Sequence, residues 1–160
     1  MSRKDPALLE TSIRKRLLDA RRHLVALEAA VAEFGTAFDI EAFEEAWMAS
    51  DPRVLHRAYV IQAGYENVID TVIAAGRELC ALKGWVVGTV EPSSVEVLRR
   101  LHENGVIDGR VRQKLKDAQQ LRSDVQHDYA NVAAREMHEA VGLVVEAAPL
   151  FIQNAAFQVR

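Results

Sequence analysis

The stretch IRKRLLDARRHLVALEAAVAEF, from Ile13 to Phe34, decides the fold class of this chain. Its apolar residues recur after four and then three positions, which places them on one face of an α-helix. Such a helix gains most of its stability by packing that face against other helices. The pattern therefore predicts an all-α fold. The apolar positions are Ile13, Leu17, Ala20, Leu24, Leu27, Val31 and Phe34.

A second long helix is predicted from about Arg53 to Leu82. It follows a short segment around residues 38–49 and begins at Asp51-Pro52, which combines an N-cap carboxylate with a first-turn proline. Gly84 is predicted to end it, and Trp85 to Val90 forms either a loop or a short extended piece. Its predicted apolar side consists of Leu55, Tyr59, Ile69, Val72, Ile73, Leu79 and Cys80.

Three further helices are predicted in the second half of the chain. Ser93-Ser94-Val95-Glu96 has the pattern of a capping box, in which the serine accepts from the helix start and the glutamate reaches back. That short helix ends near Asn104-Gly105. Asp108 caps the next helix, which breaks at Ala130-Asn131, and Pro149 predicts a kink or an early end in the last helix. Together these helices predict an antiparallel bundle of four to five helices.

Composition agrees with one globular domain over residues 1–160, because 49% of residues are apolar and 27% are charged. No apolar run approaches the roughly 20 residues of a membrane span, so no membrane contact is expected. The charged segment after the N-terminus favours a cytoplasmic protein over an exported one. The lone cysteine, Cys80, cannot form an internal disulfide, and its apolar helical position predicts a buried core thiol.

Several function classes find little support in the residues. The net charge of −3 is not that of a typical nucleic-acid-binding domain. The histidines and cysteine lack paired ligand spacing, and there is no glycine-rich phosphate loop, so neither a metal nor a cofactor is expected. The segment from Ser93 to Arg122 is similar to a helix–turn–helix. Its turn at 103–108 is longer than the 3–4 residues that this motif requires.

Arg122 interrupts an otherwise apolar helix face. Leu115 and Ala118 precede it, and Val125 and Tyr129 follow it, all at same-face spacings. A charged residue on such a face must find a partner, because burying an unpaired charge is costly. One interpretation is a structural ion pair with the second helix, where Gln62, Glu66 and Asp70 form a polar row at spacing four.

The other interpretation is a phosphate-binding site. An arginine is a permanent cation that grips phosphate, and His127 has the side chain whose ordinary pKa lies closest to neutral pH. Five residues of helix turn the side chains of Arg122 and His127 about 140° apart. Either the helix loosens near Ala130-Asn131, or a two-fold dimer brings both residues of both chains into one cleft.

Arg122, His127 and Tyr129 match the signature of the HEPN superfamily: arginine, four residues, histidine, one residue, tyrosine. The chain resembles most closely the HepT-type toxins that are encoded beside minimal nucleotidyltransferase antitoxins. A short helix, the turn at Gly105-Val106-Ile107 and a helix that ends in the signature agree with this resemblance. The chain departs from the family pattern at Ser123, where asparagine is common, and in an insertion around Phe38 to Ala49.

The resemblance implies a homodimeric, metal-independent endoribonuclease. His127 would activate the ribose 2′-hydroxyl or protonate the leaving oxygen, and Arg122 would hold the scissile phosphate. Tyr129 would be adenylylated by the cognate nucleotidyltransferase, which blocks the site for RNA.

Four further polar residues are expected to support this site: Glu66, Asp70, Ser123 and Asp124. A second branch of the superfamily, the non-catalytic substrate-binding partners of nucleotidyltransferases, carries a similar pattern and stays open as an alternative.

Overall fold

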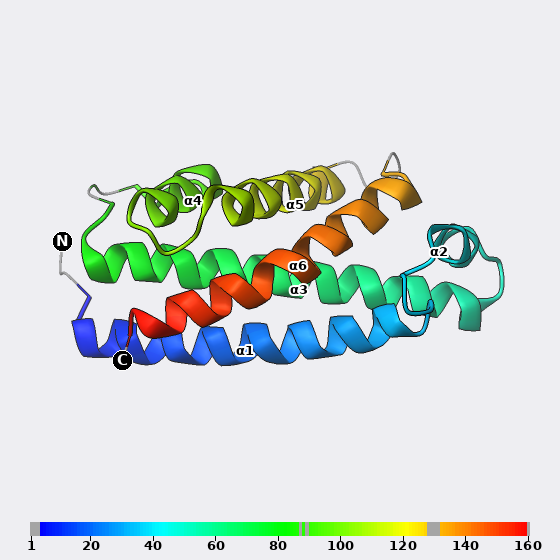
Figure 1. Ribbon diagram of the computed structural model, residues 1–160, viewed down its shortest axis with the longest axis horizontal. Coiled ribbons are helices and arrows are strands. Elements are labelled where there is room, and N and C mark those ends of the chain that lie inside the picture. Colours follow the sequence, from blue (N-terminus) through cyan, green and yellow to red (C-terminus); the bar gives the residue numbers. More distant parts are fainter. Residues whose placement is uncertain (1–3, 87, 89, 128–131, 160) are drawn as a thin grey trace.

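The computed structural model describes residues 4–86, 88, 90–127 and 132–159 (Figure 1). All helices and strands assigned within these residues are α-helices, which confirms the all-α prediction. Four are long and two, α2 and α4, are short. Their bounds are α1 Pro6–Ala32, α2 Ile40–Trp47, α3 Pro52–Lys83, α4 Ser94–Glu103, α5 Gly109–His127 and α6 Ala134–Phe157.

The helix starts follow the predicted caps. Asp51 accepts a hydrogen bond from the backbone of Arg53 at 2.9 Å, and Asp108 accepts one from Val111 at 2.8 Å. Ser93 accepts from the Glu96 backbone at 3.2 Å, but the Glu96 carboxylate does not complete the predicted capping box. It binds the guanidinium groups of the arginines at positions 99 and 100 instead, since charged donors outcompete a backbone amide.

The two longest helices, α1 and α3, lie side by side along most of their length (Figure 1). α4 and α5 lie over the C-terminal half of α3, and α6 crosses α1 and α3 and contacts α5. The described ends of the chain lie at the same end of the molecule. Buried apolar residues from all these helices form one core cluster, in which Tyr65, Phe43 and Phe151 are the largest fully buried side chains.

The predicted apolar faces account for part of this core. Of the seven apolar positions predicted between Ile13 and Phe34, six are buried, and Val31 is partly buried. The prediction for α3 was wrong at Tyr59, whose side chain is 52% exposed. The buried face of α3 is centred on Ile61, Tyr65 and Val68, and a residue two positions before Ile61 points about 160° away from it.

Pro149 predicted either a kink or an early end of the last helix. α6 continues past Pro149 to Phe157, so the early end was wrong, and the kink stays a prediction. By length and hydropathy α6 could cross a membrane, a property that core helices of soluble proteins share. Nine of its residues are buried in this fold. The predicted helix break at Ala130-Asn131 lies outside the described residues. The described residues of the 85–90 segment form no strand.

Burial of Cys80 leads to a testable prediction about its reactivity. Burial raises the pKa of the thiol from 9.0 to about 11, although the charge of Arg100 opposes this shift. Because the thiolate is the reactive form, native Cys80 should react with a disulfide reagent at pH 8 about a hundredfold more slowly than the unfolded chain. The corresponding stabilisation is present below pH 9 and is lost as the pH rises through about 11.

The rate is measured from the thiolate that the reagent releases, with and without denaturant. Equal rates in the folded and unfolded protein would contradict the buried position of Cys80.

Candidate functional site

Arg122 lies in the penultimate turn of α5 and reaches across to α3. Its Nε donates to Asp70 Oδ1 at 3.1 Å, and its Nη2 donates to Asp70 Oδ2 at 3.1 Å. Its Nη1 lies 3.7 Å from Glu66 Oε1. The structural ion pair, which was one interpretation of the sequence, is therefore present. It uses two of the three residues in the polar row, and the third, Gln62, donates to Glu66 at 3.3 Å.

This ion pair orients the guanidinium of Arg122 but contributes little to the stability of the fold. The hydrogen bonds that Arg122 donates to Asp70 raise the pKa of Arg122 above its ordinary value, and burial opposes this effect. Only 19% of the Arg122 side chain is exposed, whereas Asp70 is 51% exposed. Because solvent screens a half-exposed carboxylate, the pair contributes no more than about 1 kcal/mol to stability. A bidentate contact nevertheless holds the guanidinium in one plane.

Tyr65 connects the same turn of α5 to the core. Its hydroxyl donates to the backbone carbonyl of Ala118 on α5, one turn before Arg122. Burial raises the pKa of Tyr65, and the charge and backbone N–H of Arg122 act in the opposite direction. Tyr65 was not predicted from the sequence, although it lies at helical spacing from Ile61, Val68 and Val72, which are buried. Together, Tyr65 and Asp70 fix the position of Arg122 relative to α3.

His127 is the last residue of α5, and its side chain is exposed. α5 is continuous from Gly109 through His127, so it does not loosen between Arg122 and His127. The two side chains therefore diverge by about 140° around the helix axis. Within a single chain, Arg122 faces the α3 carboxylates and His127 faces elsewhere.

The remaining predicted site residues are divided between two places. Ser123 is half-buried and lines a groove between α4 and α5, and Asp124 is exposed and accepts from Gln120 at 3.1 Å. The structure thus brings Arg122 together with Glu66 and Asp70. Tyr129 lies outside the described residues.

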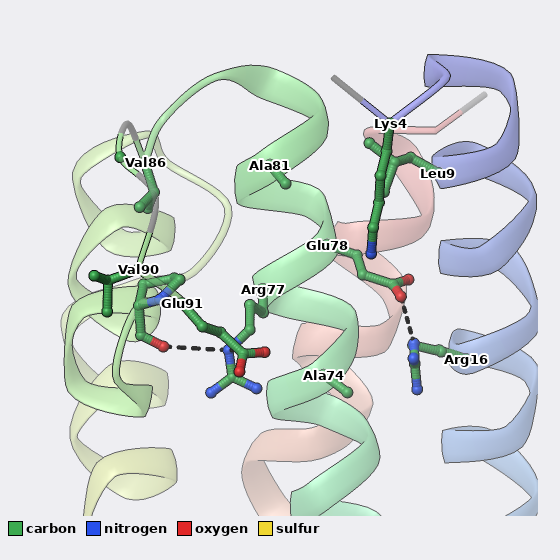
Figure 2. Close-up of a pocket in the computed structure, with 12 residues that line it drawn as sticks. Lys4, Leu9, Arg16, Ala74, Arg77, Glu78, Ala81, Val86, Val90 and Glu91 are labelled. Carbon is green, nitrogen blue, oxygen red and sulfur yellow. Dashed lines mark hydrogen bonds and ion pairs between the residues drawn. The ribbon is translucent and has the colours of Figure 1, made fainter. Parts of the chain in front are cut away.

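A separate pocket of about 480 Å³ lies between α1, α3 and residues 86, 88 and 90–92 (Figure 2). A dashed line in Figure 2 marks the contact between Glu78 and Arg16, and Arg77 Nε donates to the backbone carbonyl of Pro92 at 3.2 Å. Glu78 lies 2.9 Å from Arg16 and accepts from Ser12 at 3.0 Å, and Arg77 lies 3.4 Å from Glu91. None of the predicted site residues lines this pocket.

Comparison of the chain with family models, curated proteins and solved structures found no match. Within the described part of the chain, no group of three His, Cys, Asp or Glu side chains lies close enough together to hold a metal ion. The Arg122 cluster and the exposed His127 are thus the features from which a function can be argued.

The position of Tyr65 predicts a stability difference between two tyrosines of α3. Tyr65→Phe removes the hydroxyl that binds the Ala118 carbonyl and should lower the free energy of unfolding by about 1–2 kcal/mol. Tyr59→Phe, the matched control, removes a half-exposed hydroxyl from the same helix and should change it by less than about 0.5 kcal/mol. Urea denaturation measures both values. Equal stabilities of the two variants would show that the Tyr65 hydroxyl does not anchor α5.

Proposed function

We propose that this chain is a metal-independent endoribonuclease whose site uses Arg122 and His127. The observation that carries the proposal is a guanidinium fixed by Asp70 and Glu66 near the end of α5, five residues before an exposed histidine. A cation of fixed direction suits a phosphate, because it needs little reorganisation when charge develops. An exposed imidazole suits proton transfer near neutral pH.

The proposed reaction is attack by the ribose 2′-hydroxyl on the adjacent phosphorus. A bond forms between the 2′-oxygen and phosphorus, and the bond from phosphorus to the 5′-oxygen breaks. His127 accepts the proton of the 2′-hydroxyl while water protonates the 5′-oxygen, or His127 protonates the 5′-oxygen while water accepts the proton of the 2′-hydroxyl. Arg122 stabilises the charge on the phosphate oxygens. The need for a 2′-hydroxyl explains why RNA, rather than DNA, would be the substrate.

Cooperation of these two residues requires a second chain, since α5 directs them to different sides. A candidate contact surface lies on the face of α3 that carries Asp70. Tyr59 and Ala63 lie on this face, and Tyr59 is half-exposed. A two-fold dimer that covers this face would bring the Arg122 regions of both chains close to the symmetry axis.

In such a dimer, His127 of one chain completes the site around Arg122 of the other chain. In this proposal the cleft contains two such sites, each made from both chains.

The physiological role proposed with this activity is that of a cytoplasmic toxin in a toxin–antitoxin pair. A cognate minimal nucleotidyltransferase would neutralise it by adenylylation of Tyr129, two residues beyond His127. The added phosphate would carry negative charge close to the site and would compete with RNA for the guanidinium.

A non-catalytic partner module of a nucleotidyltransferase is the second candidate function. One observation favours it: two carboxylates already bind the Arg122 guanidinium, so an incoming phosphate must compete with them. A chain of this kind would keep the ion pair for structure alone. It would bind its nucleotidyltransferase tightly and would not slow growth when it is expressed by itself.

Cleavage of RNA by the purified protein separates these two functions. We expect cleavage that persists in EDTA and falls at least about a hundredfold in Arg122→Ala and in His127→Ala. Arg110→Ala, an exposed position on the same helix, and His23→Ala are matched controls and should retain wild-type activity. Gel analysis of labelled RNA measures the rates. Undiminished cleavage in both site variants would refute the catalytic role of these residues.

The dimer is tested independently of activity. Light scattering should give roughly twice the chain mass of 17.8 kDa for the wild type. Tyr59→Glu should shift the protein toward a monomer, because it places a charge within the proposed apolar contact. Val25→Glu, on the outer face of α1, is the control and should stay dimeric. A wild-type monomer at micromolar concentration would contradict a site built from two chains.

A further inference from the structure

A groove of about 300 Å³ lies between the start of α4 and the outer face of α5. Its volume is at the lower end of the range for small-molecule sites. α4 supplies the apolar part of the wall and α5 supplies most of the polar part. The residues that matter for its chemistry are Val95, Leu98, Lys116, Gln119, Gln120 and Ser123. Asp117 also lines the groove, and its carboxylate accepts a hydrogen bond from Gln113 at 2.9 Å.

The groove lies on the His127 side of α5. Gln120 precedes His127 by seven residues and Ser123 precedes it by four, which are same-face spacings. Seven residues of helix correspond to a rise of about 10 Å. An RNA strand that passes His127 along this face of α5 would therefore reach the groove within one or two nucleotides.

The side chains of the groove offer three kinds of contact. Gln119 Oε1 has no hydrogen-bond partner but is closed to solvent, so the half-buried Gln119 side chain must rotate into the groove to meet an N–H donor. Lys116 is an exposed cation, and Val95 is a 50% exposed apolar side chain beside buried Leu98. The amide oxygen can accept from the edge of a base, and the apolar surface can pack against the face of that base. The cation can pair with the phosphate of the same nucleotide.

The Ser93 hydroxyl contributes less, because it already accepts the Glu96 backbone N–H as the cap of α4. The Gln120 amide nitrogen is likewise engaged with Asp124. Substitution of Gln119 or Lys116 should therefore weaken ligand binding most.

We propose that this groove binds one nucleotide of the RNA, one or two positions from the cleaved bond, and sets the base preference of cleavage. The inference rests on the proposed ribonuclease activity. The base lies against Val95 and donates an N–H to Gln119 Oε1, and Lys116 pairs with the phosphate of the same nucleotide. These residues bind and select substrate, and the proton transfers belong to the Arg122 and His127 site.

The test uses the full chain with His127→Ala, which removes cleavage so that binding can be measured. A set of labelled single-stranded RNAs carries one abasic position each, at successive distances from the bond that the wild type cleaves. An abasic position that faces the groove should weaken binding about fivefold or more. In the double variant His127→Ala, Gln119→Leu, the same abasic position should not weaken binding further, because the contact with the base is already lost.

Lys116→Ala provides a second variant at an exposed position that cannot disturb the core. It should weaken binding to every RNA of the set and should lower the salt dependence of binding. Gln153→Leu on α6 and Lys15→Ala on α1 change exposed residues and are matched controls that lie outside the groove. Both should bind each RNA as the parent does.

Two failures can be told apart. One failure is that Gln119→Leu and Lys116→Ala both cleave RNA with the base preference of the wild type, and neither variant binds RNA more weakly than its control. The groove is then not a nucleotide site, but the proposed ribonuclease activity is not contradicted. If the wild type neither binds nor cleaves RNA, the proposed function and the groove assignment both fall.

Discussion

The contact between Arg122 and the α3 carboxylates is the constraint on which the site depends. α5 packs its apolar face on the bundle, and Arg122 is half-buried in that packing, so its charge needs a partner. Asp70 supplies a bidentate contact and Glu66 a longer one. Tyr65 holds the adjacent turn of α5 by its bond to the Ala118 carbonyl. The direction of the guanidinium follows from the packing of two long helices.

The same contact has two consequences for chemistry. It fixes the cation in advance, which favours transition-state stabilisation. It also surrounds the cation with negative charge, which opposes the entry of a phosphate. Asp70 is half-exposed and can be screened or displaced at modest cost, whereas a fully buried carboxylate could not. The balance between these effects distinguishes a catalytic site from a structural ion pair.

Much of this arrangement could be predicted from the sequence, because helical spacing alone places residues on a face. The spacing identified the core face of α1 and the partners of Arg122. It also gave the divergence of Arg122 and His127, since a continuous helix leaves no freedom between them. Spacing failed at Tyr59, where a single apolar residue was assigned to the wrong side of α3.

Other features depend on contacts between helices that spacing does not determine. The Tyr65 bond to α5 requires the relative position of α3 and α5. The groove beside Ser123 requires the position of α4 as well. The capping box predicted at Glu96 is incomplete because two neighbouring arginines bind its carboxylate.

The central claim is that Arg122 and His127 of one chain cannot serve one phosphate, so that each site combines two chains. Mixing Arg122→Ala chains with His127→Ala chains tests it most directly. Half of the dimers would be mixed, and each mixed dimer would hold one intact site of two, so activity should return to about a quarter of the wild-type value. Mixed dimers that form but remain as inactive as either parent would contradict the two-chain site.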